Sequence, residues 1–187
     1  MAIKTIHVPQ GFSDFAEAIS SVSGVNVNLC FQCTKCASGC PVSFAMDYTP
    51  PQLIHAIQLG LSDLVFKSKT VWLCASCQTC TTRCPQEVDL AVVMDALRII
   101  AQRQKLQAKV PEIPTFYRSA LRTVALFGRM YELGMIVMLK LATRSLSKDI
   151  GLGLKMLMKG KLNILPTFKG ALTARRIISQ VEAREKL

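Results

Sequence analysis

The sequence predicts an all-α protein made of a cysteine-bearing N-terminal part and a basic, helical C-terminal extension. Three observations lead to this prediction. Apolar residues recur at helical spacing in several segments, no segment shows the alternation of a convincing strand, and positive charge is concentrated toward the C-terminus. Half of the 187 residues are hydrophobic and only 19% are charged, which is typical of a chain that packs a core.

Helix-capping residues mark the predicted helices of the N-terminal part. Gly24 can close the first helix, Thr49 can cap the next ahead of Pro50, Gly60 can end it, and Asp89 can cap the longest. The stretch "VDLAVVMDALRIIAQRQKL" has the clearest helical stripe in the chain. The predicted helices are residues 13–23, a helix beginning at residue 50, a short one beginning at residue 62 or 63, and one beginning after residue 89.

The extension is expected to begin with a linker. "KVPEIPTF" (109–116) contains two prolines, and a helix from about Ser119 to Ser145 follows it. The basic, glycine-spaced segment "KDIGLGLKMLMKGKLNILP" precedes a final helix from Thr173. Charged residues interrupt the most apolar region (120–143), so we expect no transmembrane segment. Since the chain begins without a signal-peptide pattern, we expect a cytoplasmic protein.

Charge divides the chain unevenly. Residues 1–100 carry six Lys or Arg and seven Asp or Glu, a balance of −1, while residues 101–187 carry seventeen and five, a balance of +12. A basic surface can bind nucleic acid. Here, however, the basic residues alternate with Leu, Met and Ile, without interleaved aromatic residues or a recognisable binding motif. We expect no nucleic acid partner, although a nucleic-acid-binding iron–sulfur protein stays an alternative; a protein partner with an acidic surface fits better.

All eight cysteines lie in two runs of identical spacing, "CFQCTKCASGCP" (30–41) and "CASCQTCTTRCP" (74–85), offset by 44 residues. Disulfides are typical of small secreted chains. Structural zinc usually joins two separated C-x2-C pairs and stays an alternative. The pattern C-x2-C-x2-C-x3-C-P is typical of [4Fe–4S] ligation, so the sequence predicts two such clusters.

In paired runs of this kind, the fourth cysteine ligates the cluster of the other run. The sequence therefore predicts crossed ligation, in which each cluster takes three cysteines from one run and the last cysteine from the other. The predicted ligands are Cys30, Cys33, Cys36 and Cys84 for the first cluster, and Cys74, Cys77, Cys80 and Cys40 for the second. Trp72 and Phe31 flank the cysteine loops, where they either shield cluster sulfur or serve ordinary packing.

With every cysteine assigned to iron, no thiol is left for nucleophilic chemistry, and the sequence offers no G-x-G-x-x-G motif, P-loop or plausible triad. We therefore predict no catalytic residue. One-electron transfer between partners is the function that two close clusters support. The predicted domains are an N-terminal helical segment (1–24), a cluster domain (25–107) and the basic extension (108–187), which docks a partner.

Over residues 25–107, the paired runs separated by helices resemble the α-helical ferredoxin domain. This domain occurs in the C subunit of heterodisulfide reductases, in iron–sulfur subunits of anaerobic glycerol-3-phosphate dehydrogenase and glycolate oxidase, and in succinate dehydrogenase. The chain has neither the C-C-G domains nor the plant-type cluster found in the last three. Its length, with "FGRMYELG" and "GLGLKMLMKGKLNILP" behind the cluster domain, is similar to the heterodisulfide reductase C subunit.

That resemblance implies a non-catalytic electron-relay subunit of an oxidoreductase complex. Its partners would be a flavin subunit (the A subunit of such complexes), which also carries iron–sulfur clusters, and a C-C-G subunit (the B subunit), which cleaves a disulfide. In methanogens this disulfide joins coenzyme M and coenzyme B. A relay in a sulfur-oxidising or glycerol-3-phosphate dehydrogenase-like complex is the alternative.

Overall fold

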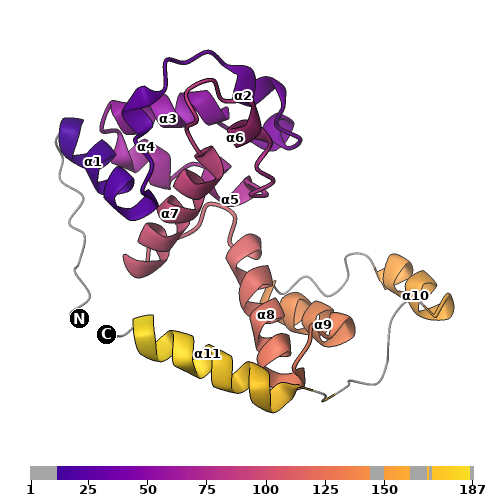
Figure 1. Ribbon diagram of the computed structural model, residues 1–187. Coiled ribbons are helices and arrows are strands. Elements are labelled where there is room, and N and C mark those ends of the chain that lie inside the picture. Colours follow the sequence, from indigo (N-terminus) through magenta and orange to yellow (C-terminus); the bar gives the residue numbers. More distant parts are fainter. Residues whose placement is uncertain (1–11, 144–149, 161–167, 169, 186–187) are drawn as a thin grey trace. The chain divides into compact units, whose positions relative to one another are not determined.

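The structure is a computed structural model and describes residues 12–143, 150–160, 168 and 170–185 (Figure 1). Over these residues the chain is helical and contains no strand, which confirms the predicted fold class. The described residues form two compact units that divide between Pro111 and Glu112. We name them the cysteine unit (12–111) and the basic unit (112–185), and each is described by itself. The predicted domain boundaries after residues 24 and 107 stay a prediction.

The cysteine unit consists of short helices joined by the cysteine loops. Its elements are α1 (Phe12–Ser23), η1 (Val27–Leu29), α2 (Lys35–Ser38), η2 (Ser43–Ala45), α3 (Pro50–Gln58), α4 (Ser62–Phe66), α5 (Thr70–Leu73), α6 (Thr79–Arg83) and α7 (Leu90–Arg103). Helix α1 contacts α3 and α7, while α2 and α6, which follow the two cysteine loops, contact each other.

Local capping explains where the longer helices of this unit begin and end. The Thr49 N–H donates to Gln52 Oε1 at 2.9 Å ahead of α3, and the Val92 N–H donates to Asp89 Oδ1 at 3.2 Å in the first turn of α7. Gly24 adopts φ +71° directly after α1, a conformation that costs glycine little. The predicted caps at these positions are confirmed.

The core of the cysteine unit lies between α1, α3 and α7. Phe15 of α1 meets Phe66 of α4 edge to face at 5.8 Å between ring centroids. The fully buried side chains with the largest volumes are Phe15, Ile19, Leu53, Ile54, Ile57, Met94, Leu97 and Ile100. The cysteine loops lie on a scaffold that buries its own apolar residues.

The basic unit contains α8 (Glu112–Phe127), α9 (Glu132–Thr143), α10 (Ile150–Met158) and α11 (Ala171–Glu185). Helix α8 contacts both α9 and α11. The Nε of Arg175 donates to the carbonyl of Ala125 at 3.0 Å, which ties α11 to α8. No helix in the described ranges is both long enough and apolar enough to cross a membrane.

Two sequence predictions for this region are wrong. The predicted linker 109–116 is too long: the division between the units lies inside it, between Pro111 and Glu112, but its residues from 112 onward belong to α8. Pro114 lies in the first turn of α8, where a missing N–H costs nothing. The single helix predicted from residue 119 is two helices, since Gly128 ends α8 at φ +78° and α9 begins at Glu132. Residues 144 and 145, at the end of that prediction, lie outside the described ranges.

Candidate functional site

The two cysteine loops have the same backbone conformation. Gln32 and Thr34 in the first loop have φ of 60° and 62°, and their equivalents 44 residues later, Ser76 and Gln78, have φ of 48° and 62°. None of the four is a glycine, so each left-handed position costs on the order of 1 kcal/mol and must be stabilised by its surroundings. The sequence repeat is therefore also a structural repeat, and strain of this kind clusters at functional sites.

Polar groups beside the cysteines favour the charged form of the sulfur. The side-chain amide of Gln32 donates to Cys30 Sγ at 3.4 Å, and the Val88 N–H donates to Cys84 Sγ at 3.3 Å. The backbone amides of Gln32, Ser76 and Ala37 act to lower the pKa of Cys30, Cys74 and Cys36, respectively, although burial outweighs them. Such donors stabilise negative charge on sulfur and therefore suit a thiolate ligand better than a neutral thiol.

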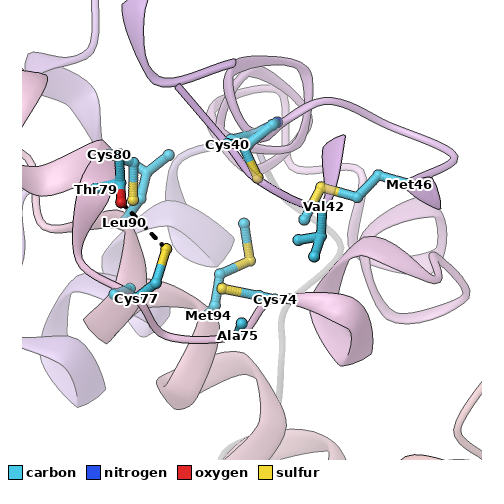
Figure 2. Close-up of a pocket in the computed structure, with 12 residues that line it drawn as sticks. Cys40, Val42, Met46, Cys74, Ala75, Cys77, Thr79, Cys80, Leu90 and Met94 are labelled. Carbon is cyan, nitrogen blue, oxygen red and sulfur yellow. Dashed lines mark hydrogen bonds between the residues drawn. The ribbon is translucent and has the colours of Figure 1, made fainter. Parts of the chain in front are cut away.

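Four cysteines from both runs line one hollow. Cys74, Cys77 and Cys80 come from the second run and Cys40 from the first, and Figure 2 shows their side chains around the same space. The other walls are mainly apolar, with Val42, Met46, Pro50, Leu90, Ala91 and Met94. Among the described residues that line the hollow, none is charged and none is a histidine.

Cys84 of the second run lies near enough to Cys30 of the first run to influence the pKa of its thiol. Burial raises the pKa of the Cys30 thiol, and the neighbouring Cys84 and Cys33 raise it further. Cys36 is buried at the start of α2, and the Val88 N–H donates to the sulfur of Cys84 at 3.3 Å. The structure thus brings Cys84 of the second run beside the first cysteines of the first run.

The cysteine environments decide which thiols are easily ionised. All eight thiols are free. Burial raises the pKa of Cys36 to about 11, and burial also raises the pKa of Cys74 and of Cys80. The exposed Cys77 differs, since its contact with Thr79 Oγ1 at 3.4 Å lowers its pKa. The buried thiols are protonated at neutral pH, so metal binding there releases protons.

Three side chains that the sequence did not single out hold the cysteine loops in place. Asp47, seven residues after Cys40, accepts from the Lys69 N–H at 2.8 Å and from Thr70 Oγ1 at 2.9 Å, ahead of the helix that leads to Cys74. The others are Gln58 of α3, which donates to the carbonyl of Cys30 at 3.0 Å, and Arg98 of α7, which donates to the carbonyl of Cys74. No local signal identifies them, because their partners lie more than twenty residues away.

The two aromatic residues beside the loops are in different environments. Trp72 is buried with 4% exposure, whereas Phe31 is 58% exposed. The indole N–H of Trp72 has no hydrogen-bond partner among the described residues. The burial of Trp72 is compatible with both predicted roles, packing and the shielding of cluster sulfur, whereas the Phe31 ring is open to solvent.

The donor set fits a [4Fe–4S] cluster. Four thiols line one mainly apolar hollow, and the Val88 N–H and the Gln32 side-chain amide donate to the sulfurs of Cys84 and Cys30, an arrangement that suits cysteine-ligated clusters. The family described as "4Fe-4S dicluster domain" matches residues 26–88, which include both cysteine runs. Fold and site together define an all-α iron–sulfur protein with two [4Fe–4S] clusters, in the electron-transfer class.

Relatives narrow this class to one family. The iron–sulfur C subunit of the CoB–CoM heterodisulfide reductase of Methanopyrus kandleri is 33% identical over 128 residues, covering 68% of this chain and 60% of that protein. The C subunit of the H(2):CoB-CoM heterodisulfide,ferredoxin reductase of Methanothermobacter marburgensis is 30% identical over 140 residues, covering 75% and 69%. A protein of Archaeoglobus profundus that is named as similar to the heterodisulfide reductase C subunit is 33% identical over 138 residues, covering 73% and 66%.

The chain belongs to the family of heterodisulfide reductase C subunits. The match spans about three fifths to two thirds of the length of these relatives. The predicted family and the two predicted clusters are confirmed.

Proposed function

We propose that this chain is the electron-relay subunit of a cytoplasmic heterodisulfide reductase-like complex. It passes single electrons between the flavin subunit, which also carries iron–sulfur clusters, and the C-C-G subunit, which cleaves a disulfide. The observation that carries this proposal is the apolar hollow in which Cys40 of the first run joins Cys74, Cys77 and Cys80 of the second. A site that joins both runs couples the two clusters within one rigid set of helices.

The proposed ligands are those of crossed ligation: Cys30, Cys33, Cys36 and Cys84 for the first cluster, and Cys74, Cys77, Cys80 and Cys40 for the second. The common hollow supports the second set. The influence of Cys84 on the pKa of Cys30 supports the first. The short helices α2 and α6, which carry the third cysteines, contact each other, as a crossing between the runs requires.

A matched pair of variants tests the crossing. Cys84→Ala should disturb the cluster of the first loop, and Cys40→Ala should disturb the cluster of the second. Iron content and electron paramagnetic resonance of each variant measure which cluster is lost. Signals are assigned with Cys33→Ala and Cys77→Ala, which each remove a central ligand of one loop. If Cys84→Ala disturbs only the cluster of Cys77, ligation is not crossed.

When bound, each cluster supplies one-electron redox chemistry. The protein would hold each cluster and set its reduction potential. Leu90 and Met94 of α7 and Val42 and Met46 after the first run limit water in the hollow. The Gln32 side-chain amide, which donates to Cys30 Sγ, and the Val88 N–H, which donates to Cys84 Sγ, would stabilise the added negative charge of a reduced cluster.

We propose that the chain carries no substrate chemistry of its own. All eight cysteines serve as ligands in this proposal, so no thiol remains to attack a disulfide. The purified chain should bind about eight irons, as two four-iron clusters do, and should bleach on reduction. Alone, it should reduce no disulfide. Turnover of a disulfide by the isolated chain would require a reactive site outside the clusters.

The basic unit is the proposed docking surface for the catalytic partner. Its helices expose large apolar side chains, among them Leu121 at 62%, Met158 at 80% and Leu172 at 83%. Basic residues accompany them, and residues 101–187 carry a balance of +12. Apolar anchors inside a charged rim are typical of protein interfaces, and the charge favours an acidic partner.

The names of the relatives suggest a substrate for the proposed complex. Those relatives are named for the CoB–CoM heterodisulfide. We propose a thiol–thiol heterodisulfide as the substrate class. The chain, purified with its flavin and C-C-G partners, should support reduction of the CoB–CoM heterodisulfide. Turnover of another sulfur compound in its place would assign the complex to a sulfur-oxidising type.

A further inference from the structure

Each cysteine loop is held at two carbonyl groups by one side chain from outside the loop. Gln58 Nε2 donates to the carbonyls of Val27 and Cys30, both at 3.0 Å. Arg98 Nε donates to the carbonyl of Val71 at 2.7 Å, and its Nη2 donates to that of Cys74. Val71 and Cys74 follow Val27 and Cys30 by the 44 residues of the repeat, so the two side chains are equivalent clamps.

The two clamps differ in charge. Gln58 is neutral, whereas Arg98 carries a positive charge, and the Arg98 side chain is only 12% exposed. Asp95 pairs with it at 3.1 Å, but the Asp95 side chain is 50% exposed. Water screens the carboxylate more than the guanidinium, so the pair leaves net positive potential at the loop of Cys74.

Other cations near the runs do not cancel this difference. Lys35 lies in the first run but is exposed, so solvent screens its charge. The guanidinium of Arg83 packs against Gly39. The contact is so close that a Cβ atom at position 39 would lie 2.7 Å from Arg83 Nη1. Gly39 and Arg83 are themselves equivalents in the repeat, so Arg83 contacts the first run from the second, and because it is exposed, solvent screens its charge as well.

Positive charge in a weakly screened environment favours the more negative, reduced state of a nearby group. We propose that Arg98 is a positioning residue that holds the second loop and gives its cluster the higher reduction potential of the two. Gln58 holds the first loop without adding charge. A single electron shared between the two clusters therefore resides mainly on the cluster of Cys74, Cys77 and Cys80. This inference rests on the proposed ligation and relay.

The test is an electron paramagnetic resonance-monitored redox titration of the full-length chain with both clusters bound. In Arg98→Gln the second clamp becomes an amide like the first. We expect the distribution of a single electron to shift about tenfold away from the second cluster, which equals about 59 mV for a one-electron couple. The first cluster should keep its potential. Arg98→Lys, which keeps the charge, should shift the second cluster less than Arg98→Gln does.

A second variant keeps the inference testable if Arg98→Gln fails to bind the second cluster. Asp95→Asn leaves the clamp in place and removes the opposing charge, so it should raise the potential of the second cluster. The inference is overturned if Arg98→Gln keeps its iron and the gap between the clusters is unchanged, or if both clusters shift equally. If Arg98→Gln loses iron, an unchanged potential in Asp95→Asn overturns it. Each of these results leaves the relay intact, whereas failure of the wild-type chain to hold two reducible clusters contradicts the relay itself.

Discussion

The cysteine unit and the basic unit treat their apolar residues in opposite ways. In the cysteine unit, Ile54, Ile57 and Leu97 have no exposed surface. In the described part of the basic unit, Met135 is the single buried hydrophobic residue, and Leu172 and Met158 are at least 80% exposed. The cysteine unit buries one face of its longer helices in a core, although loop residues such as Phe31 and Phe44 are exposed, whereas the described part of the basic unit buries few of its apolar side chains.

This difference separates two tasks. A cluster site needs ligands held by rigid elements, and the core between α1, α3 and α7 supplies that rigidity. A docking surface needs apolar side chains that stay accessible, since contiguous exposed apolar patches mark interaction sites. The comparison therefore predicts that changes in the cysteine unit alter folding and clusters, while changes in the basic unit alter partner binding.

The largest expected effect comes from removing the basic unit. A chain that ends at Pro111 should keep both clusters, because the cysteine unit buries its own core. It should lose co-purification with the catalytic partner, by on the order of 100-fold in affinity or more, since interface anchors carry most of the binding energy. Iron content and pull-down with the partner measure the two effects.

Two results of that truncation would contradict the comparison. Loss of iron would mean that residues after 111 complete the cysteine unit. Normal partner binding at physiological salt would place the docking surface on the cysteine unit instead.

The next effect concerns the core. Leu97→Ala removes a fully buried side chain of α7 and should lower the free energy of unfolding by about 2–5 kcal/mol. Leu172→Ala, the matched change at an exposed position, should lie within about 0.5 kcal/mol of wild type. Urea unfolding of the cluster-loaded chain, followed by far-UV circular dichroism under anaerobic conditions, measures both. Equal losses for both variants would show that Leu172 also packs in a core.

Sequence reasoning identified the features that are coded locally. Asp89 accepts from the Val92 N–H and the Thr49 N–H donates to Gln52 Oε1, so both caps form within three residues and could be predicted from the sequence. The ligand set could be proposed because a fixed spacing of cysteines reflects cluster geometry. The same reasoning failed at Gly128. The helical spacing of apolar residues continues through this position in the sequence, but the left-handed conformation of Gly128 ends the helix.

The supporting side chains could not be predicted, because their function depends on tertiary contacts. Gln58 and Arg98 are equivalent clamps in space, but they are separated by 40 residues rather than the 44 of the repeat. Asp47 reaches a helix 22 residues away. Polar residues of this type are common on helices and loops, and only the folded chain shows which carbonyl or N–H group they contact.

A smaller effect tests the docking surface at one residue. Leu172→Ala should weaken partner binding by about 1–2 kcal/mol, as truncation of an apolar anchor does. Leu61→Ala is the matched control, because Leu61 is an exposed leucine, at 45%, on the cysteine unit. Affinity measured by surface plasmon resonance against the partner separates the two. A greater loss for Leu61→Ala than for Leu172→Ala would place the interface on the cysteine unit.

The smallest effect concerns the surface of the cysteine unit, where a polar contact joins the segment after Cys40 to the helix before Cys74. Burial opposes ionisation of Asp47, but hydrogen bonds from Lys69 and Thr70 outweigh it and hold the pKa of its carboxyl below the usual 3.8. A carboxylate with a lowered folded pKa contributes stability that is fully present above its unfolded pKa and is lost as the pH falls through the folded pKa.

Asp47→Asn should therefore lower the free energy of unfolding by about 0.5–1 kcal/mol, a small value because the residue is exposed. The difference from wild type should be the same at pH 7 and pH 5, and it should shrink below about pH 4 as the wild-type carboxylate takes up a proton. Urea unfolding of both chains at each pH gives the difference directly. A difference that grows in acid would have the wrong sign for a lowered pKa. If Asp47→Asn leaves the free energy of unfolding unchanged at pH 7, the Asp47 contact does not stabilise the fold. The segment after Cys40 and the helix before Cys74 are then held together by the apolar walls of the hollow alone.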